Sequence, residues 1–280
     1  MTISLAHLGP VGTYSESAAL AYGKWLEEIN QQSFILCPQP SIASALSAVA
    51  NNKVNYSIVP VENSIEGTVN ITLDKLWQNK QLKILRGLTI PIVHSLLSYS
   101  DRLEAIKTVY SHPQALGQCQ KWLSSNLPQV QLIPASSTTE SLKLLADEPT
   151  AAAISSARAA QIYEIPVLAS KINDRPDNCT RFLVVGDSSN DSGSYLSLAF
   201  SLEKNVSGAL VKPLQIFAER QINLSKIESR PTKRSLGEYI FFLELEGSLQ
   251  ETKIQSALAE LSQYTEELTI FGNYDLITTV

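Results

Sequence analysis

The chain has 280 residues, 44% hydrophobic and 18% charged, and a formal net charge of −5, which is the balance of a soluble globular protein. It contains no run rich in Lys and Arg, which argues against a nucleic-acid-binding protein, and no apolar run near the roughly 18 residues that span a bilayer. Residues 1–9 lack the pattern of a signal or transit peptide, and the three cysteines are too widely spaced to suggest a disulfide framework. We therefore expect a cytoplasmic protein that binds neither nucleic acid nor a membrane.

Short apolar segments and amphipathic segments alternate along the first 187 residues. The expected elements, in chain order, are strand 3–9, helix 15–28, strand 33–39, helix 42–51, strand 56–62, a strand-rich segment 82–98 broken at Pro91, helix 103–106, strand 108–112, helix 113–126, strand 131–136, helix 139–147, strand 151–155, a short helix ending near Tyr163, and strand 182–186. Ser41 is the expected N-cap of helix 42–51. The alternating order favours an α/β protein with a parallel sheet covered by helices.

Polar segments follow several of these strands, namely GPVGTYSES, VENSIEGT, SHPQA, SSTTES and ISSAR. The carboxyl ends of parallel strands face a common crevice, which is the usual ligand site of such sheets. Several of these segments also open helices, where free backbone N–H groups and the helix dipole favour anions. The sequence therefore predicts a cleft for a small anion. The alternative is that these segments are ordinary caps and turns.

The composition changes at DSSNDSGS (187–194), which we expect to be a linker. Beyond it, the expected elements are strand 194–203, helix 210–221, strands 222–230 and 237–247, helix 249–263 and strand 265–274. This β-α-β-β-α-β order is ferredoxin-like. Small domains of this topology often bind amino acids or form oligomers, but topology alone does not establish a function.

Short motifs over almost the whole chain resemble one enzyme family. GPVGTYSESA (9–18), VPVENSIEGTVN (59–70), SHPQALGQC (111–119), SSTTESL (136–142) and NCTRFLVV (178–185) resemble, in order and spacing, the catalytic domain of prephenate dehydratases. GAL (208–210) and ESRP (228–231) resemble the two effector-binding motifs of the regulatory ACT domain of these enzymes. Tyr14 and Gly117 stand where Phe and Ala are common in the family.

The resemblance implies a two-lobed catalytic domain like the type II periplasmic binding proteins, followed by a ferredoxin-like (βαββαβ) ACT domain. The catalytic domain would cover 1–187, with one lobe at 1–90 and 165–187 and the other at 91–164, and the ACT domain would cover 194–274. We expect a monofunctional enzyme, because no chorismate mutase helices precede the first strand. The family also implies a homodimer or homotetramer with L-phenylalanine as its effector.

The reaction implied by the family is the conversion of prephenate to phenylpyruvate in L-phenylalanine biosynthesis, a carbon–oxygen lyase reaction. Carbon dioxide and water are lost, and because the product is aromatic, no cofactor or metal is expected. Arogenate dehydratase remains the close alternative, since its substrate differs only in an amino group where prephenate has a keto group. A non-catalytic amino-acid sensor and a secreted binding protein are alternatives of other classes.

The family assigns an essential function to Thr180 of the TRF motif, whose hydroxyl would donate a hydrogen bond or relay a proton to the leaving hydroxyl group. Arg181 is either a carboxylate clamp or a partner in an ion pair between the lobes. In an extended strand these two side chains point to opposite faces, so only one enters the cleft, and we expect this to be Thr180 with Phe182 on its face. Glu62 is expected to lie behind the contact residues, because its charge would repel a dianionic substrate.

The remaining site residues follow from the matched motifs. Substrate contacts are expected from Asn63, Ser64, His112, Gln114, Ser137, Thr138, Thr139, Ser155 and Asn178. Effector contacts are expected from Gly208, Ala209, Leu210, Glu228, Ser229, Arg230 and Pro231, the last four across a dimer contact. His7 and His94 are expected to be structural, and no spacing of His, Cys, Asp and Glu suggests a metal site.

Overall fold

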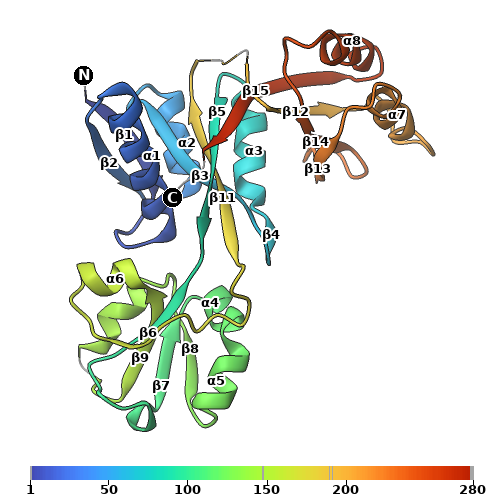
Figure 1. Cartoon of the computed structure of the whole chain (residues 1–280). Coiled ribbons are helices and arrows are strands. Elements are labelled where there is room, and N and C mark those ends of the chain that lie inside the picture. The colour runs from blue at the N-terminus through green and yellow to red at the C-terminus, as the bar shows by residue number, and fades with distance from the viewer. Residues whose placement is uncertain (1, 147, 189, 191, 278–280) are drawn as a thin grey trace.

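The structure, a computed structural model, describes residues 2–146, 148–188, 190 and 192–277. Its elements are β1 (Ile3–Leu8), α1 (Tyr14–Asn30), β2 (Phe34–Gln39), α2 (Ile42–Ala50), β3 (Tyr56–Asn63), β4 (Gly67–Thr68), α3 (Asn70–Gln78), β5 (Lys83–Pro91), β6 (His94–Leu97), η1 (Leu103–Ala105), β7 (Thr108–Ser111), α4 (Pro113–Gln118), α5 (Gln120–Asn126), β8 (Gln131–Pro134), η2 (Glu140–Leu145), β9 (Ala151–Ser156), α6 (Ala157–Ile162), β10 (Val167–Ala169), β11 (Cys179–Gly186), β12 (Tyr195–Ser201), α7 (Val211–Glu219), β13 (Leu224–Pro231), β14 (Tyr239–Glu246), α8 (Thr252–Leu261) and β15 (Glu267–Ile277). Figure 1 shows them as two lobes, one above the other, with a smaller domain beside the upper lobe.

The upper lobe, called lobe 1, is built on the strands β2-β1-β3-β11-β5. β1, β2 and β3 are parallel, and β11 runs antiparallel between β3 and β5. Alternate strand residues face opposite layers: Ile58 and Phe182 belong to the core under α1, whereas Val59 and Leu183 belong to the core under α2 and α3. The predicted N-cap Ser41 is confirmed, since its side chain accepts from the Ser44 backbone N–H.

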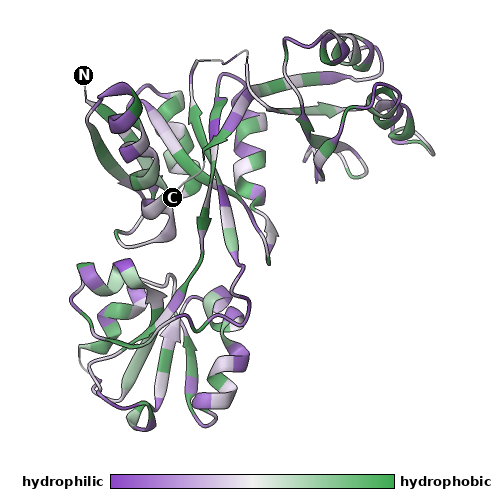
Figure 2. Cartoon of the chain, viewed as in Figure 1, coloured by the Kyte–Doolittle hydropathy of each residue, from purple (hydrophilic) through white to green (hydrophobic). Residues whose placement is uncertain are grey.

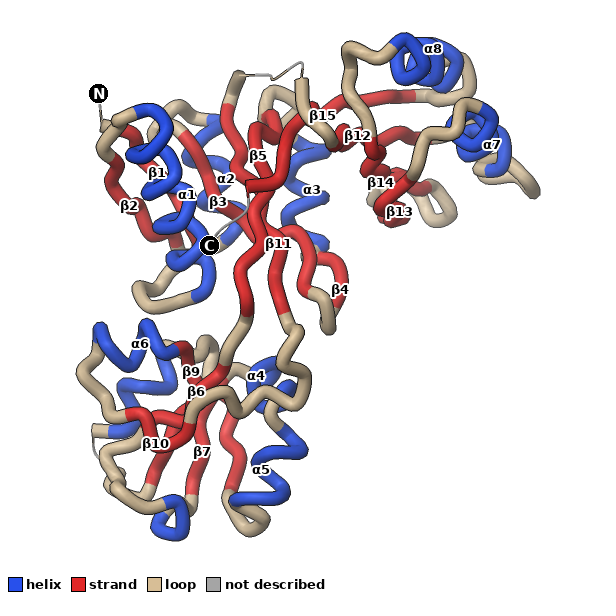
Figure 3. The backbone as a smooth tube through the Cα atoms, viewed as in Figure 1, coloured by secondary structure: helices blue, strands red, loops and turns tan. Residues whose placement is uncertain are grey.

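The lower lobe, called lobe 2, contains a second sheet in the order β10-β6-β9-β7-β8. The chain enters it after β5 and returns to lobe 1 before β11, as the two loops between the lobes in Figure 3 show. The expected boundary at residue 165 is wrong, because Val167 of β10 pairs with Leu97 of β6 in lobe 2. Leu168 and Ala169 pack on the apolar core of the same lobe, which explains why the chain stays there.

The small domain has the β12-α7-β13-β14-α8-β15 order that the sequence predicts. Its last strand runs beyond the expected end at 274, and Asp275, Leu276 and Ile277 pair in parallel with β5 of lobe 1. The two sheets are therefore continuous. A Cβ on Gly272 would overlap the Ile84 carbonyl oxygen, so glycine permits the close approach of β15 to β5.

Several helices differ from the expected ones. α3 was not among the expected elements, although Leu73 and Leu76 are buried at helical spacing. The helix expected over 113–126 breaks at Cys119, and the backbone N–H groups of Lys121 and Trp122 are instead capped by the Asp174 carboxylate. The helix expected over 139–147 is the 3-10 helix η2, and residue 147 lies outside the described residues.

Apolar residues follow the strands of both sheets and polar residues gather on the outer helices and loops (Figure 2). Among the described residues, no helix is long and apolar enough to cross a membrane. The same residues contain no cluster of His, Cys, Asp and Glu that could hold a metal ion.

Candidate active site

A cavity of about 330 Å³ lies between the two lobes. Its walls come from the β1–α1 loop, the end of β3, the first crossover, α4, the loop after β8 and the start of β11. Four of the five polar segments predicted from the sequence therefore converge on it, whereas ISSAR does not line it. The lining residues are Leu8, Gly9, Thr13, Tyr14, Ser15, Pro60, Asn63, Val69, Ile92, His94, His112, Gln114, Ala115, Gln118, Ser136, Ser137, Thr138, Thr180 and Phe182.

Thr180 lies on β11 directly opposite Asn63 of β3. The Asn63 side-chain oxygen accepts from the backbone N–H groups of Ile65 and Glu66, each at 3.0 Å, so the Asn63 amide nitrogen must face the other way. That nitrogen donates to Thr180 Oγ1 at 2.9 Å. Among the described residues, the Thr180 hydroxyl has no protein acceptor for its own proton. Asn63 therefore orients Thr180 as a hydrogen-bond donor toward the cavity.

The hydrogen bonds continue from Thr180 along the cavity wall. Asn63 also donates to Asn178 Oδ1 at 2.9 Å, and Asn178 donates to Gln118 Oε1 at 2.9 Å. His94 Nε2 lies 3.0 Å from the same Gln118 oxygen. Burial lowers the pKa of His94, with the Gln118 hydrogen bond opposing it only in part, so this imidazole is neutral at pH 7.

Tyr14 closes this wall of the cavity. Its hydroxyl donates to the Val93 carbonyl at 2.7 Å and lies 3.2 Å from His94 Nδ1. Burial raises the pKa of Tyr14, which therefore remains a neutral phenol. The wall formed by Tyr14, His94, Gln118 and Asn63 is polar but carries no net charge.

The cavity offers neutral donors to an anion. None of the lining residues described by the structure is Lys, Arg, Asp or Glu. The 17-residue helix α1 begins at the cavity, with Thr13 as its N-cap and Ser15 in its first turn. The unpaired N–H groups and dipole at such a helix start favour a carboxylate.

Seven of the predicted substrate contacts line the cavity, namely Asn63, His112, Gln114, Ser137, Thr138, Thr180 and Phe182. Four other residues that were expected to contact the substrate do not line the cavity, namely Ser64, Thr139, Ser155 and Asn178. Thr139 and Ser155 are fully buried away from the cavity, because both lie in close-packed parts of lobe 2. Asn178 is buried behind the wall, where it bonds Asn63 and Gln118. Ser64 is exposed, and its hydroxyl accepts from the Cys179 N–H.

Arg181 lies on the opposite face of β11 from Thr180, as strand alternation predicts, and it does not line the cavity. Its Nη1 lies 2.6 Å from Glu244 of β14, and its Nη2 lies 3.1 Å from Glu62. The role of carboxylate clamp is therefore wrong, and Arg181 joins lobe 1 to the small domain. Glu62 does not line the cavity either, and it also lies 3.2 Å from Lys226 of β13.

Several cavity residues were missed by the sequence analysis. The segment GPVGTYSES was predicted to face the ligand, but its individual contact residues were not named. The structure shows that Thr13, Tyr14 and Ser15 line the cavity. His94 was assigned to structure alone, and Gln118 is hidden within a helical motif. Only the long-range contacts of His94 and Gln118 reveal their place in the cavity wall.

A second cavity, of about 400 Å³, lies in the small domain. Its lining residues are Leu202, Glu203, Asn205, Val206, Gly208, Ala209, Leu210, Val211, Ser229, Glu238, Tyr239 and Phe241. Glu228, Arg230 and Pro231 do not line it, and their expected contact with the effector across a dimer contact stays a prediction. Side chains alternate along β13, so Glu228 and Arg230 face lobe 1 while Ser229 faces the cavity.

The family model for prephenate dehydratase matches residues 5–190, and the ACT domain model matches residues 197–263. The chain is 39% identical over 274 residues to the bifunctional chorismate mutase/prephenate dehydratase of Aquifex aeolicus, covering 97% of this chain and 73% of that one. It is 38% identical over 272 residues to the prephenate dehydratase of Methanocaldococcus jannaschii, covering 95% of each chain.

A solved structure agrees with these sequence matches. The prephenate dehydratase of Arthrobacter aurescens, in complex with L-Phe, superposes with a TM-score of 0.87 at 32% identity and covers 98% of this chain and 90% of that one. The predicted α/β fold, with a C-terminal ACT domain, is thereby confirmed. The chain therefore belongs to the prephenate dehydratase family of enzymes.

Proposed function

We propose that the cavity between the lobes converts prephenate to phenylpyruvate, carbon dioxide and water in L-phenylalanine biosynthesis. Residues 2–188 would form the catalytic domain and residues 195–277 the regulatory domain. The bond to the ring carboxylate breaks, its electron pair moves into the ring, and the C4–oxygen bond breaks with hydroxide leaving. A proton converts the hydroxide to water. The observation that supports this reaction most is the Thr180 hydroxyl, held by Asn63 as a donor toward the cavity.

Thr180 would donate a hydrogen bond to the oxygen on which negative charge develops as the C4 bond breaks. A threonine hydroxyl is a poor acid, so stabilisation of the leaving oxygen by this bond is the better-supported role. The lack of a lining Arg or Lys, among the described residues, also suits decarboxylation. A cation that bound both oxygens of the ring carboxylate would stabilise the substrate before it reacts. It would thereby oppose the movement of the carboxylate's negative charge into the ring.

We propose prephenate rather than arogenate as the substrate. Arogenate carries an ammonium group where prephenate carries a keto group, and no carboxylate of the described residues lines the cavity to pair with it. An unpaired buried charge is costly, so we expect kcat/KM for prephenate to exceed that for arogenate by at least about tenfold. Separate assays of the purified chain with each compound measure this ratio. A higher kcat/KM with arogenate would make arogenate dehydratase the correct function.

We propose that L-phenylalanine binds in the cavity of the small domain and regulates the catalytic domain. The Arthrobacter relative is described in complex with L-Phe, and here Gly208 and Ser229 line a cavity that also contains aromatic and acidic side chains. β13 provides a physical connection, because Ser229 faces this cavity while its neighbours face lobe 1. Glu228 accepts from Thr68 Oγ1 at 2.8 Å, and Arg230 lies 3.2 Å from Asp74.

The variant Arg230→Gln is expected to bind L-phenylalanine with a Kd within about threefold of the wild type, while its kcat/KM responds to L-phenylalanine much less. The reason is that the Arg230–Asp74 contact lies outside the cavity but joins β13 to α3. Calorimetry measures the binding, and the response of kcat/KM measures the coupling.

The matched variant is Gly208→Val, at a residue with φ of +80°. A β-branched residue is strained there and its side chain enters open space, so binding itself should weaken by at least about tenfold. An unchanged response of Arg230→Gln to the effector would exclude the β13 connection.

We propose that the chain works in the cytoplasm as a homodimer or homotetramer. All three cysteines are free, which suits a reducing compartment. Exposed apolar side chains, Val206, Val211 and Leu236, lie on the small domain and would be covered by a second copy. Light scattering on the purified chain measures the oligomeric state, and a monomer at micromolar concentration would contradict this part of the proposal.

A further inference from the structure

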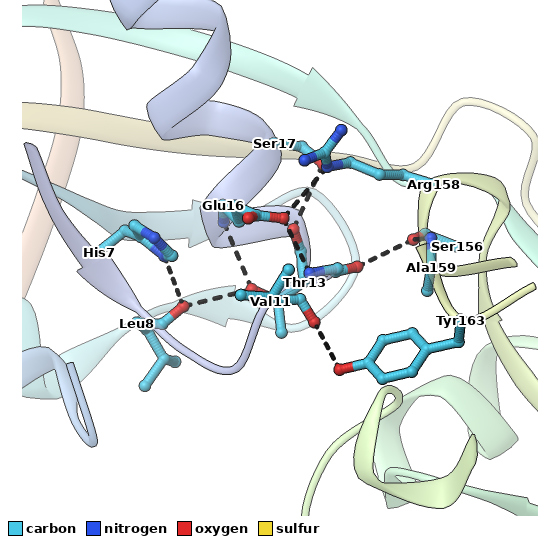
Figure 4. Close-up of polar contacts among 11 residues, drawn as sticks. His7, Leu8, Val11, Thr13, Glu16, Ser17, Ser156, Arg158, Ala159 and Tyr163 are labelled. Carbon is cyan, nitrogen blue, oxygen red and sulfur yellow. Dashed lines mark hydrogen bonds and ion pairs between the residues drawn. The ribbon is translucent and has the colours of Figure 1, made fainter. Parts of the chain in front are cut away.

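Glu16 is a buried carboxylate that lies beside the cavity without lining it. Its side chain is 5% exposed, and it occupies the third position of α1. In a capping box, a carboxylate at this position accepts from the backbone N–H of the N-cap residue. Here the N-cap Thr13 accepts from the Glu16 N–H at 3.3 Å (Figure 4). The carboxylate reaches one residue further and accepts from Gly12 N at 2.8 Å. Glu16 thus holds the loop that precedes its own helix.

The same carboxylate connects the two lobes. Glu16 Oε2 lies 3.1 Å from Nε of Arg158, which extends from α6 of lobe 2 as Figure 4 shows. Ser156, the N-cap of α6, donates to the Gly12 carbonyl at 3.0 Å. Gly12 is therefore bound at its nitrogen by Glu16 and at its oxygen by lobe 2.

Lobe 2 also packs directly on the Gly12 loop. Gly12 has a φ of +87°, and a Cβ there would lie 3.1 Å from Thr139 Cγ2 and 3.2 Å from Ala159 Cβ. The neighbouring Val11 carbonyl accepts from the Tyr163 hydroxyl at 3.2 Å. This loop leads straight into Thr13, which lines the cavity, so contacts with lobe 2 set the position of that wall.

The ion pair of Glu16 and Arg158 also determines the charge near the start of α1. A carboxylate of the substrate is expected at the N-terminus of α1, where the helix dipole attracts anions. The buried charge of Glu16 lies in the first turn of the same helix and would repel that carboxylate. Arg158 neutralises it from behind the cavity, and none of the lining residues that the structure describes is a cation.

We infer that Glu16 and Arg158 form a positioning pair for the dehydration. The pair fixes the Gly12 loop between the lobes and cancels a charge that would otherwise repel the anionic substrate. Neither side chain touches the substrate. This inference rests on the proposed function, since it requires an anion at the N-terminus of α1.

The variant Arg158→Gln leaves Glu16 buried and unpaired. We expect its KM for prephenate to rise by at least about tenfold while kcat falls by less than about threefold, because repulsion acts on binding. In the double variant Glu16→Gln/Arg158→Gln, the glutamine oxygen can still accept from Gly12 N and no charge remains. Its KM should return to within about threefold of the wild type.

The control is Arg102→Gln, which removes an exposed arginine of lobe 2 away from the cavity and should leave KM unchanged. A KM of Arg158→Gln within about twofold of this control, or no recovery in the double variant, would overturn the inference. Hydrogen exchange of residues 9–16 gives a readout that needs no turnover. It should be at least about tenfold faster in Arg158→Gln than in Arg102→Gln, and equal exchange would also overturn the inference. If the wild type did not turn over prephenate while exchange was still faster in Arg158→Gln than in Arg102→Gln, the proposed function would be refuted instead.

Discussion

Replacing Thr180 with valine is expected to lower kcat for phenylpyruvate formation by roughly 10²–10³-fold, the cost of removing one placed donor to a developing negative charge. Valine keeps the shape of threonine, so the buried position next to Asn63 is filled without a cavity. Asn63 loses one acceptor but keeps the Asn178 side-chain oxygen and the Cys179 carbonyl. The fold should therefore persist, and the loss should appear in the rate of the chemical step.

Two controls separate chemistry from structure in this experiment. Thr180→Ser retains the hydroxyl and should keep kcat within about tenfold of the wild type. The affinity of Thr180→Val for L-phenylalanine should be unchanged, because the effector cavity shares no residue with the cavity between the lobes. If Thr180→Val turned over prephenate within about threefold of the wild type, the hydroxyl would have no part in the mechanism.

Replacing Arg181 with methionine is expected to destabilise the junction between lobe 1 and the small domain by about 3–5 kcal/mol, because it leaves a buried carboxylate without its cation. The Glu244 side chain is 6% exposed and lies 2.6 Å from Arg181. Tyr274 also donates to Glu244, at 2.6 Å. Since Arg181 follows Thr180 directly, loss of this anchor should also lower kcat.

Trp77 provides a local probe of the junction. Trp77 lies on α3 of lobe 1, and its ring meets Phe242 of β14 edge to face, with centroids 6.4 Å apart. The other tryptophans, Trp25 and Trp122, lie on α1 and α5. With Trp25 and Trp122 replaced by phenylalanine, the urea midpoint of Trp77 fluorescence reports the junction. The exposed pair of Arg234 and Glu266 gives the control, and Arg234→Met should barely move that midpoint.

The effect of Arg181→Met should depend on pH. Burial by itself would raise the pKa of Glu244, but the charge and hydrogen bond of Arg181, with hydrogen bonds from Tyr274 and Ser225, hold it below its ordinary value. Stability from this pair is therefore complete above the ordinary glutamate pKa and is lost as pH falls through the lowered one. The difference between wild type and Arg181→Met should shrink in acid. A difference that is constant with pH would contradict the assigned ion pair.

The sequence predicted local features of the site correctly where one periodicity decides them. Alternation along β11 placed Thr180 and Phe182 toward the cavity and Arg181 away from it. The same rule applied to β13 would have separated Ser229 from Glu228 and Arg230, but the motif was treated as one unit. The helix α3 was missed for a related reason, because its buried positions lie within a short segment next to a polar motif.

The contacts that the sequence could not provide join residues far apart in the chain. Arg158 and Glu16 are 142 residues apart, and Asn63 and Thr180 are 117 apart. Nothing in the local pattern distinguishes Ser155, which is buried, from Ser137, which lines the cavity. Such differences depend on how the two lobes pack, and packing becomes visible only in the structure.

The most direct test of the account is the stoichiometry of prephenate turnover by the purified wild-type chain. Carbon dioxide and phenylpyruvate should form in equal amounts at neutral pH, far faster than in buffer alone and without added metal or cofactor. If prephenate remained unchanged while the chain was folded and bound L-phenylalanine, the proposed dehydratase activity would be refuted.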